Sequence, residues 1–228
     1  MKWHWIDLVL CYVGSLVLYI LLSGLILKPV QELVSQQGYD VTVVWFLSSL
    51  LLQAGLLLSL VWLIVIRYRR CRWQDIGLVF PSITSILKYG VVGGMFLAIG
   101  MIGLSYVMVW FQPNAEAQGI EVALRLAPDR ISLMFLVLAA CVVAPLSEEI
   151  FFRGLIYTYV RAYLPTPAAM ALSGLIFGLV HFDLLRFLPV ALGGILLCYF
   201  YEKSGSIWVS ILGHSLWNGI MVIAVLTN

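Results

Sequence analysis

Three charged side chains lie close together in a stretch that is otherwise apolar, "SEEIFFRG" at residues 147–154. Glu149 and Arg153 are four residues apart, a spacing that brings a glutamate and an arginine together on one face of a helix. A charge at the centre of a bilayer costs about 2.5–3.5 kcal/mol on insertion scales, and pairing makes that cost tolerable. We therefore interpret Glu149 and Arg153 as a supporting ion pair, and Glu148 as the carboxylate that is free to take part in chemistry.

Two histidines and an asparagine supply further polar groups in apolar segments. His181 ends "FGLVH", while His214 and Asn218 in "HSLWN" share one helical face. Peptide hydrolysis needs a general base for water, a proton donor for the leaving amine and hydrogen-bond donors for the oxyanion. We predict four catalytic residues: Glu148 and His181 to activate a water, and His214 and Asn218 to stabilise the oxyanion.

The chain turn at "YLPTPAAM" brings two of these residues to one depth. Glu148 precedes the turn and His181 follows it by about 16 residues each, or about 25 Å along each helix. If both segments are continuous helices, the carboxylate and the imidazole should lie within about 6 Å and share one water. Pro145 has no N–H, so the carbonyl four residues earlier loses its partner, and loosened backbone at membrane depth usually lines a cavity.

The composition indicates that these residues lie in a membrane protein. Hydrophobic residues make up 63% of the 228 residues and charged ones 11%, against about 25% charged in soluble domains. We expect one integral membrane domain over residues 1–228, with N-terminal helices in 1–112 and the catalytic core in 130–220. The predicted fold is an all-α polytopic bundle of about seven transmembrane helices, with the site among helices four, five and seven. The expected spans are Ile6–Leu27, Val41–Ile66, Ile86–Phe111, Ile131 to about Tyr159, Pro167–Asp183, Phe187–Tyr201 and Ser206–Leu226.

The distribution of Lys and Arg predicts the orientation. The basic run "RYRRCRW" follows the second span, and basic loops favour the cytoplasmic side. Alternating from that loop places nine basic residues inside and four outside, with the N-terminus inside. The first group is Lys2, Arg67, Arg69, Arg70, Arg72, Lys88, Arg153, Arg161 and Lys203, and the second is Lys28, Arg125, Arg130 and Arg186.

The stretches "EEIFFR" (148–153), "FGLVH" (177–181) and "HSLWN" (214–218) resemble, in order and spacing, the EExxxR, FxxxH and HxxxN motifs of the CAAX-protease and bacteriocin-processing (CPBP) family. This family includes the type II CAAX prenyl endopeptidases. The resemblance covers about residues 130–220 and implies an intramembrane endopeptidase in which the first glutamate and the FxxxH histidine handle a water. The HxxxN pair then helps to stabilise the oxyanion. The partners expected are the lipid bilayer, in a bacterial cytoplasmic membrane, and a membrane-associated peptide or protein substrate, whose identity and prenylation the sequence leaves open.

Other interpretations stay open at this point. We expect no cofactor, but Glu148, His181 and His214 could supply three zinc ligands, which is the usual number in zinc hydrolases. A catalytically silent bacteriocin-immunity or scaffold protein would retain the same residues. A transporter could use Glu and His for proton relay, yet no second copy of the Glu–Glu segment indicates an internal repeat. The small net charge of +2 does not suggest a nucleic-acid partner.

Overall fold

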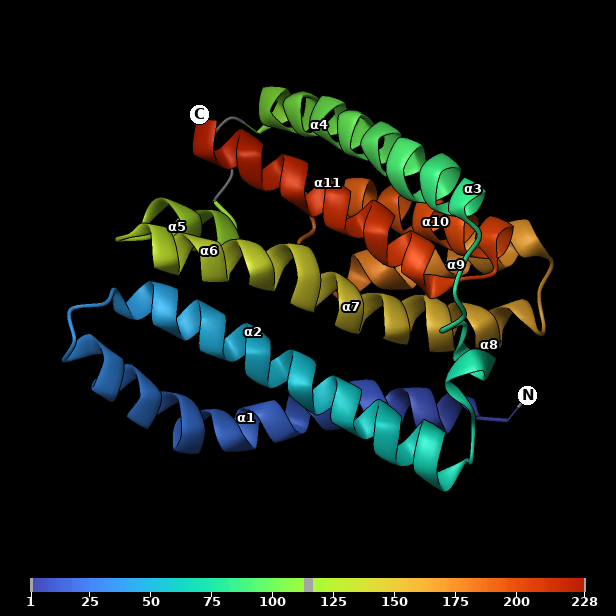
Figure 1. Ribbon diagram of the computed structural model, residues 1–228, viewed down its shortest axis with the longest axis horizontal. Coiled ribbons are helices and arrows are strands. Elements are labelled where there is room, and N and C mark those ends of the chain that lie inside the picture. The colour runs from blue at the N-terminus through green and yellow to red at the C-terminus, as the bar shows by residue number, and fades with distance from the viewer. Residues whose placement is uncertain (1, 113–116, 228) are drawn as a thin grey trace.

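The computed structural model describes residues 2–112 and 117–227, and all regular secondary structure in these two ranges is helical (Figure 1). The predicted all-α fold is therefore confirmed. The first half contains α1 (Trp5–Ser35), α2 (Val41–Leu60), η1 (Val61–Tyr68), η2 (Trp73–Ile76), α3 (Ile83–Ser85), η3 (Ile86–Val92), α4 (Gly93–Phe111) and α5 (Gly119–Arg125). The second half contains α6 (Arg130–Leu138), η4 (Ala139–Val143), α7 (Ala144–Glu149), η5 (Ile150–Tyr157), α8 (Thr158–Arg161), α9 (Thr166–Leu179), α10 (Phe187–Ser204) and α11 (Ile207–Thr227).

Five helices in the described ranges are long and apolar enough to cross a membrane, so the chain is an integral membrane protein. They are Trp5–Ser35, Val41–Tyr68, Ile83–Met108, Arg130–Arg161 and Ile207–Thr227. The other two expected spans are also helices, but α9 has only 14 residues and α10 carries Glu202 and Lys203 near its end. The count of seven spans is therefore not confirmed, although the helical bundle is.

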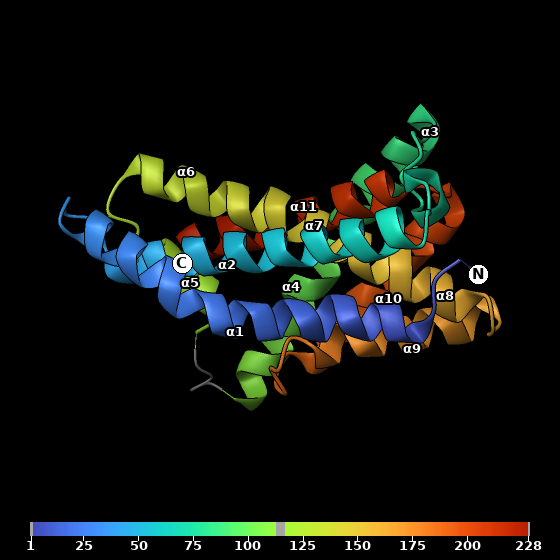
Figure 2. The same ribbon diagram turned by 90° about the horizontal axis from the view of Figure 1, so that it is seen from below.

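Most basic residues lie at one end of the bundle, at the N-terminus and in the turns between helices. The N-terminus, the turn after η1, the turn between α8 and α9 and the turn between α10 and α11 lie together in both views (Figures 1 and 2). The opposite end holds the α1–α2 turn, α5 and the last turns of α4 and α11. Arg153 does not belong to either end, because it is buried inside the bundle with 1% of its side chain exposed.

The spans are not uniform α-helices. The span that carries Glu148 and Glu149 contains two π-helical segments, η4 and η5, on either side of α7. In η4 the N–H of Ala144 bonds to the carbonyl of Ala139, five residues earlier. Such π segments are frequent at functional sites, because they change which side chains and backbone groups face inward.

Close packing of α9 against α10 depends on glycines that face one another. A Cβ atom on Gly174 would lie 2.4 Å from a side-chain carbon of Ile195 and 2.7 Å from the carbonyl oxygen of Ala191. A Cβ on Gly194 would lie 3.0 Å from Gly174 Cα. The backbones therefore touch directly, as they do where small residues line helix interfaces in membranes. This contact fixes the position of Phe177, three residues after Gly174, over the core of the bundle.

We predict that Gly174→Ala lowers the stability of the bundle by about 1–3 kcal/mol, because the added methyl group has no space between α9 and α10. Thermal unfolding in detergent measures this effect. Gly100→Ala in α4 is the matched control, since a Cβ there meets no atom within 4 Å. Gly100→Ala should unfold at the wild-type temperature or slightly above it. Equal stability of the two variants would contradict the proposed close contact.

Candidate active site

Glu149 and Arg153 form a fully buried ion pair in the span built from α7 and η5. Arg153 Nη1 lies 3.0 Å from Glu149 Oε1, and the two side chains are 1% and 0% exposed. This is the pairing that their spacing predicts. A charge buried to this extent needs its partner, because removing either one leaves the other desolvated and uncompensated.

Arg153 also connects its own segment, η5, to two further helices of the bundle. Its Nη2 donates a hydrogen bond to the backbone carbonyl of Gly194 in α10, at 3.3 Å. Its guanidinium lies over the ring of Phe177 in α9, 4.4 Å from the ring centroid, in a cation–π arrangement. The arginine therefore holds η5, α9 and α10 at fixed positions around Glu149.

His214 contacts the same carboxylate from α11. Its Nδ1 lies 2.8 Å from Glu149 Oε1. A carboxylate that is ionised by pairing with Arg153 can only accept, so Nδ1 must carry the proton and donate it. The ring is held from the sides as well, stacked on Trp217 at a centroid distance of 5.4 Å and packed edge-on against Phe177 at 5.9 Å. The remaining nitrogen, Nε2, is then an acceptor in the neutral ring and a donor in the imidazolium.

Glu148 lies on the other side of this imidazole. Its Oε2 is 3.9 Å from His214 Nε2, and its side chain is 28% exposed. The two adjacent glutamates therefore face the two nitrogens of one histidine, one carboxylate buried and paired and the other open. Glu148 can reach a water or a substrate in a way that Glu149 cannot.

His181 lies just beyond the helix that was expected to carry it. The expected span Pro167–Asp183 is too long, because α9 ends at Leu179 and His181 lies in the following turn. The His181 ring is exposed, and its Nδ1 donates to the carbonyl of Phe177 at 2.7 Å. Among the described residues, no hydrogen bond or ion pair joins His181 to Glu148. Because the assumption of two continuous helices fails at this point, a water shared between them stays a prediction.

Asn218 makes a contact that the sequence interpretation did not include. Its side-chain Nδ2 donates to the backbone carbonyl of Ala140 at 2.8 Å. In the π-helical register of η4, the partner of that carbonyl would be the N–H of residue 145, which is Pro145 and has none. The carbonyl that loses its partner is therefore that of Ala140, five residues before the proline and not four as expected. Asn218 supplies the missing hydrogen bond. One N–H of the amide remains for the predicted oxyanion role.

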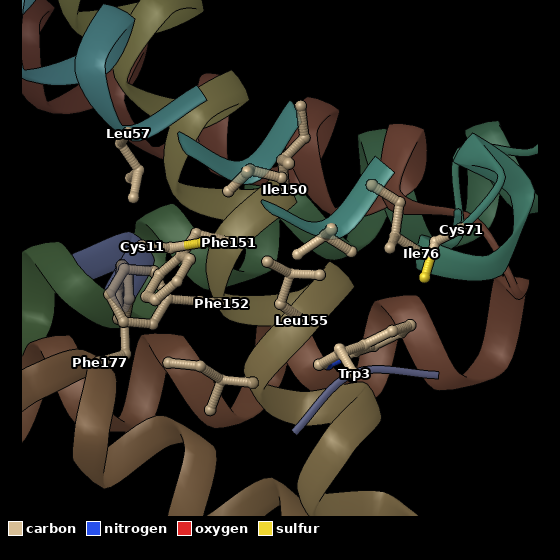
Figure 3. Packing of buried hydrophobic residues seen from close by; sticks show 13 residues of the cluster. Trp3, Cys11, Leu57, Cys71, Ile76, Ile150, Phe151, Phe152, Leu155 and Phe177 are labelled. Atoms are coloured by element: carbon tan, nitrogen blue, oxygen red, sulfur yellow. The ribbon is translucent and has the colours of Figure 1, made fainter. Parts of the chain in front are cut away.

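The N-terminal helices contribute one residue near the site that sequence reasoning missed, Tyr12 in α1. Its ring stacks on Phe151 at 5.5 Å, and its hydroxyl donates to the carbonyl of Val180 at 3.5 Å, next to His181. The aromatic cluster of Phe151, Phe152 and Phe177 fills the core beneath it (Figure 3). A lone tyrosine in an apolar span carries no sequence signal, so only the packing of α1 against η5 reveals it.

The three residues considered as zinc ligands do not gather into one cluster. Over the part of the chain that the structure describes, no group of three or more His, Cys, Asp and Glu side chains is arranged to hold a metal ion. Glu148 and His214 are near each other, whereas His181 is turned toward the carbonyl of Phe177. Metal dependence is therefore a question for chelation experiments.

Comparison with known proteins points to the same part of the chain. Residues 130–220, which include all three motifs, match the family model described as "Type II CAAX prenyl endopeptidase Rce1-like". The chain is also 27% identical over 137 residues to the "Putative membrane peptidase YdiL" of Bacillus subtilis (strain 168), a match that covers 58% of this chain. The chain spans about half of that relative, with 54% of its length covered. No solved structure matches the chain at a significant level. These matches confirm the family resemblance that the three motifs carry.

We predict that Arg153→Ala destabilises the protein by about 3–5 kcal/mol, because it leaves the Glu149 carboxylate buried without its counter-charge. Arg161→Ala is the matched control. Arg161 pairs with Glu202 at 3.3 Å, but its side chain is 40% exposed, so its loss should cost about 1 kcal/mol or less. Thermal unfolding in detergent compares the two. A similar small loss for both variants would show that the buried pair is not a structural support.

Proposed function

We propose that this chain is an intramembrane endopeptidase that hydrolyses a peptide bond in a membrane-associated peptide or protein. One observation carries the proposal. Glu148 is 28% exposed and lies 3.9 Å from the Nε2 of a histidine whose Nδ1 is held by the buried Glu149. An open carboxylate beside an oriented imidazole is an arrangement that can perform general acid–base catalysis. The match to the prenyl endopeptidase family model supports the same class of reaction.

The proposed reaction begins with activation of water. Glu148 takes a proton from the water as its oxygen attacks the scissile carbonyl carbon, while His181 orients the water through its free Nε2. The carbon becomes tetrahedral and its oxygen becomes negative. Glu148 then gives the proton to the amide nitrogen, the C–N bond breaks, and the products are an amine and a carboxylic acid that keeps the second proton of the water. Each proton that is taken from water is thus returned to the leaving group.

His214 and Asn218 are proposed to stabilise the oxyanion. His214 Nε2 donates a hydrogen bond only in the imidazolium form, because Nδ1 already donates to Glu149 in either form. Asn218 offers the amide N–H that Ala140 does not use. Donors that are held before the reaction starts contribute most, since they need no rearrangement when charge develops.

We predict that Glu148→Gln abolishes cleavage, by at least about 100-fold, while leaving thermal stability nearly unchanged. The side-chain amide of the glutamine cannot take a proton from water. Because residue 148 is partly exposed, the substitution should cost little stability. The measurement compares peptides released from membranes that contain the wild-type protein or the variant, identified by mass spectrometry. The purified proteins are then tested in vesicles on the peptides that only the wild type releases.

Wild-type cleavage by the folded Glu148→Gln variant would overturn this mechanism. If the wild-type protein releases no peptide at all, the chain is a catalytically silent immunity or scaffold protein. Chelator treatment in the same assay examines the zinc alternative. Stoichiometric zinc, with activity lost on chelation and restored only by metal, would make Glu148 a ligand instead of the base.

We also propose that the end of the bundle with the turn between α8 and α9 faces the bacterial cytoplasm, as the eight-to-four distribution of basic residues favours once the buried Arg153 is left out. The four native cysteines are buried or partly buried and can be replaced, leaving single sites to label. A cysteine at Ala162 should be protected from an impermeant reagent in intact cells. A cysteine at Gln37, at the opposite end, should react. Labelling at Ala162 with protection at Gln37 would reverse the orientation.

A further inference from the structure

A hollow of about 840 Å³ opens where the second membrane span ends, at η1 and the turn after it. Its lining combines apolar side chains with basic and aromatic ones. The lining residues are Leu63, Ile64, Ile66, Arg67, Tyr68, Arg70 and Cys71. The hollow lies apart from Glu148 and His214, and the proposed cleavage reaction does not involve it.

The two arginines of this lining are available for an outside anion. Their neighbour Arg69 is already occupied, because it donates to both oxygens of Asp7 at 2.9 and 3.0 Å. Arg67 and Arg70 are both exposed, and neither forms an ion pair with a carboxylate within residues 2–112 and 117–227. The guanidinium of Arg67 lies 5.7 Å from the ring centroid of Trp62, which keeps it at the edge of the helix. Two positive charges therefore face the same hollow without a partner carboxylate.

The backbone at Arg70 is strained in a way that does not favour an arginine. Its φ is +55°, a left-handed conformation that follows the helix end and is normally given to glycine or asparagine. The turn is closed by backbone bonds from Arg69 to Ile64 and from Cys71 to Val65, at 2.9 and 3.2 Å. Glycine would adopt this turn without steric cost. A large charged side chain at such a position indicates a role for the side chain outside the fold.

The position of the hollow defines what can fill it. Val41–Tyr68 is a membrane-spanning helix, so its last turn lies where hydrocarbon gives way to headgroups. A ligand there can lay an apolar chain along Leu63 and Ile66 while its charged group meets the arginines. Basic side chains beside a span attract anionic lipids, and guanidinium groups bind phosphate through paired hydrogen bonds.

We propose that this hollow is a binding site for an anionic phospholipid, in which Arg67 and Arg70 hold the phosphate and the apolar side chains receive part of an acyl chain. The site anchors the end of the second span at the membrane surface. Because α2 packs against α7, bound lipid also supports the helix that carries Glu148.

The test is native mass spectrometry of the purified protein with phosphatidylglycerol, compared with phosphatidylcholine. The wild type should retain phosphatidylglycerol preferentially, and Arg70→Gly should retain it about tenfold less. The melting temperature of Arg70→Gly without lipid should be unchanged or higher, because glycine relieves the positive φ. Arg67→Gln provides a second variant that leaves the backbone turn alone and should also lose retention.

Lys203→Gln is the matched control, since it removes one exposed positive charge at the same end of the bundle. It should retain phosphatidylglycerol as the wild type does. Equal loss with Lys203→Gln would mean that diffuse surface charge binds the lipid, and the proposal would fail. Unchanged retention by Arg70→Gly and Arg67→Gln would also overturn it. Displacement of the lipid by inorganic phosphate or glycerol phosphate at equal concentration would identify a site for soluble anions instead.

Discussion

The buried ion pair between Glu149 and Arg153 is the interaction on which the rest of the site depends. The Glu149 carboxylate accepts from Arg153 in its own span and from His214 in α11. Arg153 in turn contacts the Gly194 carbonyl in α10 and the ring of Phe177 in α9. Four helices thus meet at one charge pair that water does not reach. Such a pair contributes little net stability over an apolar equivalent, but it tolerates only one arrangement of its partners.

This constraint gives two adjacent glutamates different chemistry. Glu149 is fully buried and accepts from two donors, so it is an acceptor that sets the orientation of His214. Glu148, one residue earlier, projects where 28% of its side chain stays exposed, and it faces the other nitrogen of the same ring. The difference lies in environment and not in side-chain type. A reactive carboxylate such as Glu148 needs access to water and substrate. The buried and paired Glu149 holds the surrounding side chains in fixed positions.

Local spacing predicted much of this structure. The helices follow the apolar runs to within a few residues at most ends, and the four-residue spacing of Glu149 and Arg153 correctly predicted their contact, because side-chain periodicity in a helix is a local property. The extent of α9 was not predictable in the same way, since its end at Leu179 interrupts an apolar run that continues to His181. The contact from Asn218 to Ala140 depends on a π-helical register around Pro145, and no residue pattern specifies that register. Tyr12 reaches the site only through the packing of α1, a long-range contact that a single sequence does not encode visibly.

The most direct test of this account is the protonation of His214, observed by ¹⁵N NMR of the imidazole nitrogens in detergent. The chain has only three histidines, so replacing His4 and His181 in turn assigns the signals of His214. The account predicts that neutral His214 carries its proton on Nδ1, which donates to Glu149, and leaves Nε2 unprotonated. A neutral His214 with its proton on Nε2 in the wild-type protein would contradict the account, because Glu149 would then not be the acceptor that orients the ring.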